Sequence, residues 1–100
     1  MSLNRAEVAR TADELAANLE RSGLTREALA AALGFTASRL DATLRVKRSS
    51  DPVDVWQLRD TLEQAVRVAG ADPVPFTVLT EASRQSARQW FALRTPPPIG

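Results

Sequence analysis

The segment from residue 25 to residue 44, TREALAAALGFTASRLDATL, constrains the fold of this chain more than any other stretch. It contains two short apolar-periodic runs separated by Gly34, and a threonine that can cap a helix precedes each run, Thr25 and Thr36. A tight turn between two helices requires positive φ, which glycine adopts at little cost. The segment therefore predicts two short helices joined at Gly34.

The side-chain sizes within this pair are those of a helix-turn-helix. Two helices that cross near a right angle tolerate only a small side chain at their contact point, and Ala30 stands there, four residues before Gly34. Leu29, Leu33 and Leu40 are spaced to point inward and lock the pair together. In such a motif the second helix enters the major groove of DNA.

Capping signals predict a helix on each side of this pair. Asn4 and Glu7 have the spacing of a capping box, and the helix that they begin ends at Gly23. Asp51, followed by a proline, begins a further helix that ends at Gly70. On this helix three charged residues at i,i+4 spacing predict a ladder on the solvent face: Arg59, Glu63 and Arg67.

The pattern changes after residue 70. Two prolines push the residues before them into extended geometry, so residues 72–79 are expected to be extended. Thr80 can cap a last helix that runs to Leu93. Alternatively, residues 76–79 and 90–93 pair as a small hairpin; we favour the helix.

One hundred residues form a single domain with one core. The expected fold class is all-α: a bundle of four to five helices that contains the helix-turn-helix, with an extended proline-containing segment near the C-terminus. Residues 1–95 are expected to form this domain and its C-terminal extension, and residues 96–100 a flexible, exposed proline-rich tail. Four aromatic side chains are expected in the core: Trp56, Phe76, Trp90 and Phe91.

The composition excludes most catalytic chemistry. The chain has no cysteine and no histidine, which removes thiolate nucleophiles, cysteine zinc sites, the usual general base and the commonest metal ligand. Asp51 and Asp54 need no substrate, since they cap a helix and occupy its first turn. We therefore expect no enzyme activity, cofactor or metal. The apolar runs are far shorter than the roughly 18 residues of a membrane span, and no secretory signal is visible, so the expected location is the cytoplasm.

Positive charge is concentrated on the predicted helix-turn-helix. The whole chain has a net charge of only +1, but residues 21–48 carry six cations and two carboxylates, a net of +4. Residues 1–20 sum to −2 and residues 49–100 to −1. This distribution favours phosphate contacts by five cations: Arg26, Arg39, Arg45, Lys47 and Arg48.

Residues 25–44, TREALAAALGFTASRLDATL, resemble the λ-repressor-like helix-turn-helix superfamily. Three further stretches, MSLNRAEVARTADELAANLERSGLT, DVWQLRDTLEQ and PVPFTVLT, resemble the bacterial family catalogued as domain of unknown function 2316, and this likeness covers nearly the whole chain. The second resemblance implies a helix-turn-helix fold and no particular activity. The first implies the positions that face the groove, with Arg26 starting the supporting helix: Thr36, Ala37, Ser38, Asp41, Ala42 and Arg45.

These positions depart from those of a strong sequence reader. Ala37 and Ala42 can touch only a thymine methyl group. Asp41 would face a polyanion unless it accepts a hydrogen bond from a cytosine amino group. Only Arg45, or Arg39 if it turns toward the groove, can make the bidentate contact with guanine.

Two functions follow from this reasoning. The first is a small transcriptional regulator that binds double-stranded DNA as a homodimer, because two copies on a palindrome double the few base contacts of one helix. The second is a protein–protein interaction module on the same scaffold, without sequence-specific DNA binding, in which residues 72–79 offer an edge to a protein partner. No membrane, metal or cofactor is expected as a partner.

Overall fold

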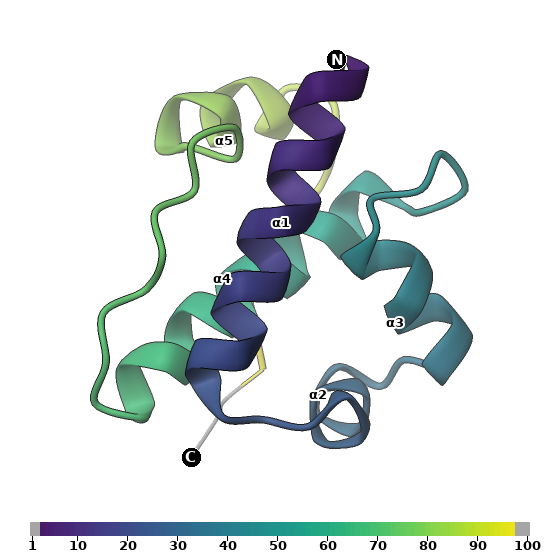
Figure 1. The fold of residues 1–100 in the computed structure, drawn as a ribbon. Helices are drawn as coiled ribbons and strands as arrows, with labels where there is room; N and C mark the ends of the chain where they lie inside the picture. Colours follow the sequence, from purple (N-terminus) through teal and green to yellow (C-terminus); the bar gives the residue numbers. More distant parts are fainter. Residues whose placement is uncertain (1–2, 98–100) are drawn as a thin grey trace.

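The computed structural model describes residues 3–97, and this part of the chain contains five α-helices and no strand (Figure 1). The all-α class predicted from the sequence is therefore confirmed. In chain order the helices are α1 (Arg5–Ser22), α2 (Arg26–Leu33), α3 (Ala37–Leu44), α4 (Pro52–Val68) and α5 (Glu81–Arg88).

The predicted caps define where the first three helices begin. Asn4 Oδ1 accepts a hydrogen bond from Glu7 N at 2.8 Å, and Glu7 Oε1 accepts one from Asn4 N at 3.0 Å, which completes the capping box. The hydroxyls of Thr25 and Thr36 cap α2 and α3, accepting from the amide three residues on. Gly34, with φ of 72°, ends α2 in the left-handed region, as predicted.

The core lies where α1 crosses α4. These two long helices pack against each other near the middle of the molecule, and α2 and α3 lie together to one side (Figure 1). Leu15 of α1 and Leu58 and Leu62 of α4 are completely buried between them. Leu29 of α2 and Leu40 of α3 belong to the same cluster, so the short helices are anchored to the long pair by apolar contacts.

A polar stripe on α1 holds the extended segment, residues 72–79. The buried side chain of Asn18 donates a hydrogen bond to Val74 O at 3.0 Å and accepts one from Val74 N at 2.8 Å. The Glu14 carboxylate accepts from Thr77 N at 3.0 Å and from Thr77 Oγ1 at 2.7 Å. These side chains replace the strand partner that an extended backbone otherwise needs. Residues 72–76 form neither helix nor strand, as expected of an extended arm, but the chain bends at residues 77–79, so the extended stretch is shorter than predicted.

The last helix forms but is shorter than predicted. Thr80 caps it, as expected, and a helix here rules out the hairpin alternative. It ends at Arg88, because the amides of Gln89 and Trp90 bond three residues back and tighten the last turn. On α5 the side chain that faces the core is Ala87, which is 3% exposed. The core position predicted for Trp90 is wrong, since its side chain is 71% exposed, and Phe91 is half-buried.

Arg59 is buried, so the prediction that its ladder with Glu63 and Arg67 lies on the solvent face is wrong. The Arg59–Glu63 pair does form, at 3.4 Å. Residues 72–79 cover this face of α4, however, and Arg59 Nε donates to Leu79 O at 3.1 Å. Its guanidinium also lies over the ring of Phe76, 4.6 Å from the centroid. Contacts with the extended segment thus bury Arg59, which the helix alone would leave at the surface.

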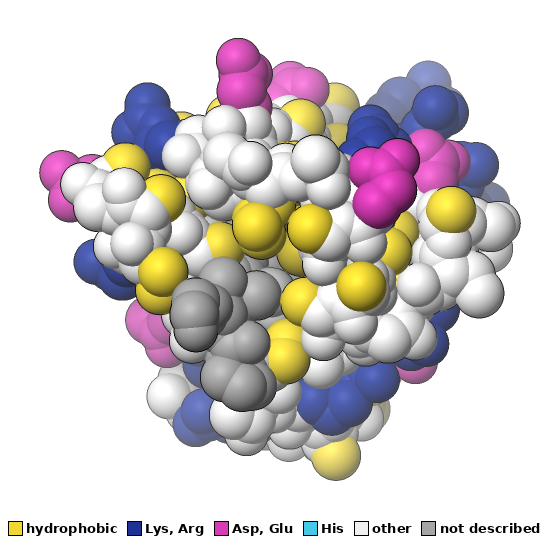
Figure 2. All heavy atoms as spheres, turned by 90° about the horizontal axis from the view of Figure 1, so that it is seen from below, with side chains coloured by type: hydrophobic (Ala, Val, Ile, Leu, Met, Phe, Trp, Pro, Cys, Tyr) yellow, Lys and Arg dark blue, Asp and Glu magenta, His cyan; other side chains and the backbone are white. Residues whose placement is uncertain are grey.

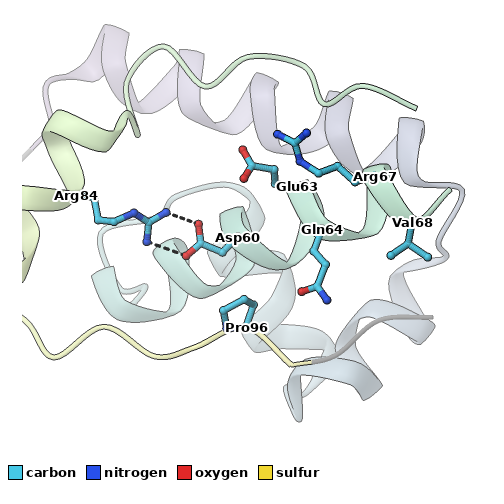
Figure 3. Close-up of a pocket in the computed structure, with 7 residues that line it drawn as sticks. All are labelled: Asp60, Glu63, Gln64, Arg67, Val68, Arg84 and Pro96. Carbon is cyan, nitrogen blue, oxygen red and sulfur yellow. Dashed lines mark hydrogen bonds and ion pairs between the residues drawn. The ribbon is translucent and has the colours of Figure 1, made fainter. Parts of the chain in front are cut away.

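An ion pair joins α5 to α4 (Figure 3). The two Nη atoms of Arg84 donate to the two carboxylate oxygens of Asp60 at 2.9 and 2.5 Å. These hydrogen bonds hold the pKa of the Arg84 guanidinium above its usual value. The same guanidinium lies 4.9 Å from the ring centroid of Trp56, so α5 is fixed in position by charge and by stacking.

The C-terminal tail starts against the body of the protein. Pro96 and Pro97 are half-buried, not exposed as expected, and Pro96 lines a shallow pocket beside α4 (Figure 3). Residues 98–100, the rest of the predicted tail, lie outside the described part of the chain. None of the described helices is both long and apolar enough to cross a membrane. Among residues 3–97, no three acidic side chains gather as metal ligands would.

Candidate nucleic-acid interface

The first turn of α3 is open to solvent. Thr36, Ala37 and Ser38 are all exposed. Thr36 Oγ1 accepts from Arg39 N at 3.1 Å, so its hydroxyl acts as a cap. The positive end of the α3 dipole therefore faces solvent behind small side chains, an arrangement that lets a large anion approach the backbone closely.

Asp41 lies among three cations from separate parts of the chain. Arg26 Nη1 of α2 is 3.5 Å from Asp41 Oδ1, and Arg45 Nε at the end of α3 is 3.2 Å from the same oxygen. Lys47 Nζ in the following loop is 3.8 Å from Oδ2. We call these four residues the Asp41 cluster.

The Asp41 cluster is accessible and carries excess positive charge. The side chains of its cations, Arg26, Arg45 and Lys47, are 61, 67 and 50% exposed, and one carboxylate leaves a net charge of +2. Exposed ion pairs contribute only about 0–1 kcal/mol each, so another anion can replace the carboxylate at little cost. The cluster thus offers exposed cationic donors to an anion.

Arg39 points away from this cluster and pairs with Asp54 of α4. Arg39 Nε and Nη2 donate to Asp54 Oδ2 and Oδ1 at 2.8 and 2.7 Å. The guanidinium also stacks on Phe35, 3.9 Å from the ring centroid. Arg94, beyond α5, binds the same carboxylate. The pair joins α3 to α4, so Arg39 has a structural role. Its side chain is 43% exposed, and a phosphate contact by its outer edge would be additional to that role.

The hydrogen bond from Arg39 lowers the pKa of Asp54, and a further hydrogen bond from Arg94 lowers it again. The pKa of Arg39 is raised in turn by its bond to Asp54. The role expected for Asp54 from its position in the first turn of a helix is therefore incomplete. Its partners lie 15 and 40 residues away, and no local spacing signals them.

The ten residues predicted to bind DNA separate into groups. Ala42 is half-buried on α3, and Arg48 lies beyond the cluster, where it lines a cavity with Val55 and Trp56 of α4. The structure therefore brings four of the predicted residues together at Asp41 and leaves three exposed at the start of α3. It places the other three, Arg39, Ala42 and Arg48, in separate surroundings.

Charge of both signs is distributed over the lower face of the molecule (Figure 2). Apolar side chains gather near the centre of this face, and Lys, Arg, Asp and Glu lie around its edge, in places side by side. This face offers no continuous basic surface.

Comparison with known proteins identifies a family. The family described as "Uncharacterized protein conserved in bacteria (DUF2316)" matches residues 1–92, a range that includes all five helices and the extended segment. Comparisons with curated proteins and with solved structures gave no match. The chain belongs to the DUF2316 family of bacterial proteins.

Proposed function

We propose that this protein is a small bacterial DNA-binding regulator, and not an enzyme, that acts in the cytoplasm as a homodimer. In this proposal α2, the Gly34 turn and α3 form a helix-turn-helix of the λ-repressor-like type. The observation that carries the proposal is the Asp41 cluster: three exposed cations from α2, α3 and the next loop lie around one replaceable carboxylate.

The cluster supplies phosphate contacts in this proposal. Arg26, Arg45 and Lys47 exchange Asp41 for backbone phosphates, and the DNA releases counterions as they bind. The exposed first turn of α3, with Ala37 and Ser38, then lies in the major groove. Because those side chains read few base edges, most of the affinity comes from phosphates, and a second copy on a palindrome supplies specificity.

The direct test is Arg45→Ala. We expect the variant to bind duplex DNA about five- to tenfold more weakly, and the salt slope of log K to decrease by about one, because one phosphate contact is lost. Fluorescence anisotropy of a labelled duplex between about 50 and 200 mM salt measures both quantities. Arg67→Ala is the matched control, because Arg67 is an exposed cation near the end of α4 and should not affect either quantity. Absence of salt-sensitive binding by the wild-type protein contradicts the proposal.

Asp41→Asn tests whether the carboxylate competes with phosphate. Removing its charge frees three cations, so we expect tighter binding and a steeper salt slope than in the wild type. Asp72→Asn changes the net charge equally in the exposed part of residues 72–79 and should have little effect. Weaker binding by Asp41→Asn, confined to sites rich in G·C pairs, would instead show that Asp41 accepts from cytosine.

Selection from random duplex DNA tests the homodimer and the reading of sequence together. An enriched palindrome would support two copies and give the spacing of their half-sites. Sedimentation of the protein with that duplex then measures the stoichiometry, for which we expect two chains per site. One chain per site would contradict the homodimer.

The exposed indole of Trp90 favours a second candidate, a protein-interaction module. At 71% exposure it is the kind of aromatic side chain that anchors an interface. On this proposal a partner captured from native lysate survives nuclease treatment, is lost with Trp90→Ser and is retained with Arg45→Ala. Loss of the partner on nuclease treatment would favour the DNA-binding proposal.

A further inference from the structure

A cavity of about 480 Å³ lies between the loop after α3, the start of α4, and α5. Its size is within the range of small-molecule sites, which run from about 300 to 1,000 Å³. Val55 and Trp56 of α4 and Ala87 of α5 form the inner wall and are each at most 5% exposed. Val8 of α1 and Phe91 beyond α5 form the rim and are half-buried.

The wall of this cavity is apolar. Ten of its fourteen lining residues are hydrophobic, and the hydroxyls of the two serines are already bonded to backbone carbonyls, Ser50 to Lys47 O and Ser83 to Val78 O. Water in such a space finds few polar partners. An occupant with an apolar body releases that water and gains contact with the aromatic rings.

The mouth of the cavity is cationic. Lys47 and Arg48 line it, and no Asp or Glu does. Lys47 belongs to the Asp41 cluster, but Arg48 forms no ion pair with any carboxylate of residues 3–97. Its side chain is therefore available to a ligand that brings its own negative charge.

The loop that carries these cations is held in an unusual conformation. Val46 has φ of 52°, a region that a β-branched residue rarely adopts, and its side chain lines the cavity. Hydrogen bonds fix the loop around it: Lys47 N donates to Ala42 O at 3.0 Å, and Ser50 N to Lys47 O at 2.9 Å. Strained residues held in this way concentrate at ligand-binding sites.

We propose that this cavity binds a small carboxylic acid with an apolar body. The carboxylate pairs with Arg48 at the mouth, and the apolar body packs against Trp56 of the inner wall and Phe91 of the rim. The site shares Lys47 with the Asp41 cluster, but its anionic ligand pairs with Arg48, which lies outside that cluster, so the proposal does not depend on whether the protein binds DNA.

Decanoate is the test ligand, with decanol and acetate as controls that each lack one half of it. The protein is the full chain with Trp90→Phe, which leaves Trp56 as the sole tryptophan and places the fluorescent reporter in the cavity wall. We expect decanoate, below its micelle concentration, to change Trp56 emission saturably and to bind one to one by calorimetry. Decanol should bind about tenfold more weakly because it lacks the charge-assisted pair, and acetate should not bind measurably.

Two variants assign the two halves of the site. Arg48→Gln should reduce decanoate affinity to that of decanol and leave decanol unchanged. Arg67→Gln is an equal charge change on α4, outside the lining of the cavity, and should change neither affinity. Val8→Phe fills the cavity from its rim and should weaken both ligands. Helix content by circular dichroism establishes that each variant is folded. If Val8→Phe does not fold, the result with Arg48→Gln still decides the test.

Three results overturn the proposal. The first is absence of saturable decanoate binding. The second is equal affinity for decanoate and decanol with no effect of Arg48→Gln, which would mean unspecific apolar adsorption. The third is self-association that Val8→Phe abolishes while decanoate has no effect, which would assign the cavity to a second copy of the chain. All are measured without DNA, so they are independent of the DNA-binding proposal.

Discussion

Asp54 is a buried carboxylate whose charge is balanced by two arginines from distant segments. Its side chain is 5% exposed, while Arg39 and Arg94 are 43 and 42% exposed. One acid thus ties α3 and the segment after α5 to the start of α4. Because desolvation of a charge costs free energy unless it is paired, removal of the acid affects all three parts at once.

Asp54→Asn is expected to lower the free energy of unfolding by roughly 1–3 kcal/mol at neutral pH, because two guanidinium groups lose their anionic partner. The pKa of Asp54 in the folded protein lies below its unfolded value of about 3.9. The carboxylate therefore stabilises the fold fully above that value, and its contribution is lost as the pH falls through the lower folded pKa. Urea unfolding at several pH values should show the difference in unfolding free energy between wild type and variant narrowing as the pH falls below the unfolded pKa of about 3.9. A difference that does not change with pH would contradict this account.

At the scale of elements, the turn between α2 and α3 depends on the backbone of one residue. A Cβ added to Gly34 would meet no atom within 4 Å, so the obstacle to substitution is its φ of 72°. We expect Gly34→Ala to reduce the free energy of unfolding by about 1 kcal/mol and Gly34→Asn by less, since asparagine tolerates this region. Thermal unfolding of the pair of variants measures the difference. Equal losses would contradict this explanation, because alanine and asparagine differ in how well they tolerate positive φ.

Sequence reasoning succeeded where the signal and its partner are neighbours. The caps at Asn4, Thr25, Thr36 and Asp51 bond to residues two or three positions away, and a sequence displays such spacings directly. It failed for Arg59, because the segment that buries this side chain bonds to it from 20 residues away. Burial by a distant extended segment leaves no periodic trace in the helix that it covers.

The candidate site divides in the same way. The Arg45–Asp41 pair is an i,i+4 contact that spacing predicts, and Arg26 and Lys47 complete the group only through the packing of α2 and the loop. Arg39 has the same charge and lies on the same helix, yet it turns toward Asp54. Local net charge located the basic region of the chain, but it did not assign each cation a partner.

At the scale of the whole molecule, Asn18 connects the first helix to residues near position 74. Asn18→Leu keeps the size of the side chain and removes both hydrogen bonds to Val74, so we expect a loss of about 1–3 kcal/mol of unfolding free energy. Amide hydrogen exchange gives a local readout. Protection of the Val74 amide should be lost, while amides in the middle of α4 keep theirs. Unchanged protection at Val74 would contradict the proposed role of Asn18.

The contact between Asn18 and Val74 also sets the order in which folding can finish during synthesis. The two residues are 56 positions apart in the sequence, and Glu14 and Thr77 are 63 positions apart. While the ribosome is still making α4, the polar stripe of α1 has no backbone to bind, and an amide that will be buried stays in water. Folding therefore completes only after the extended segment emerges, and until then the polar stripe of α1 stays hydrated.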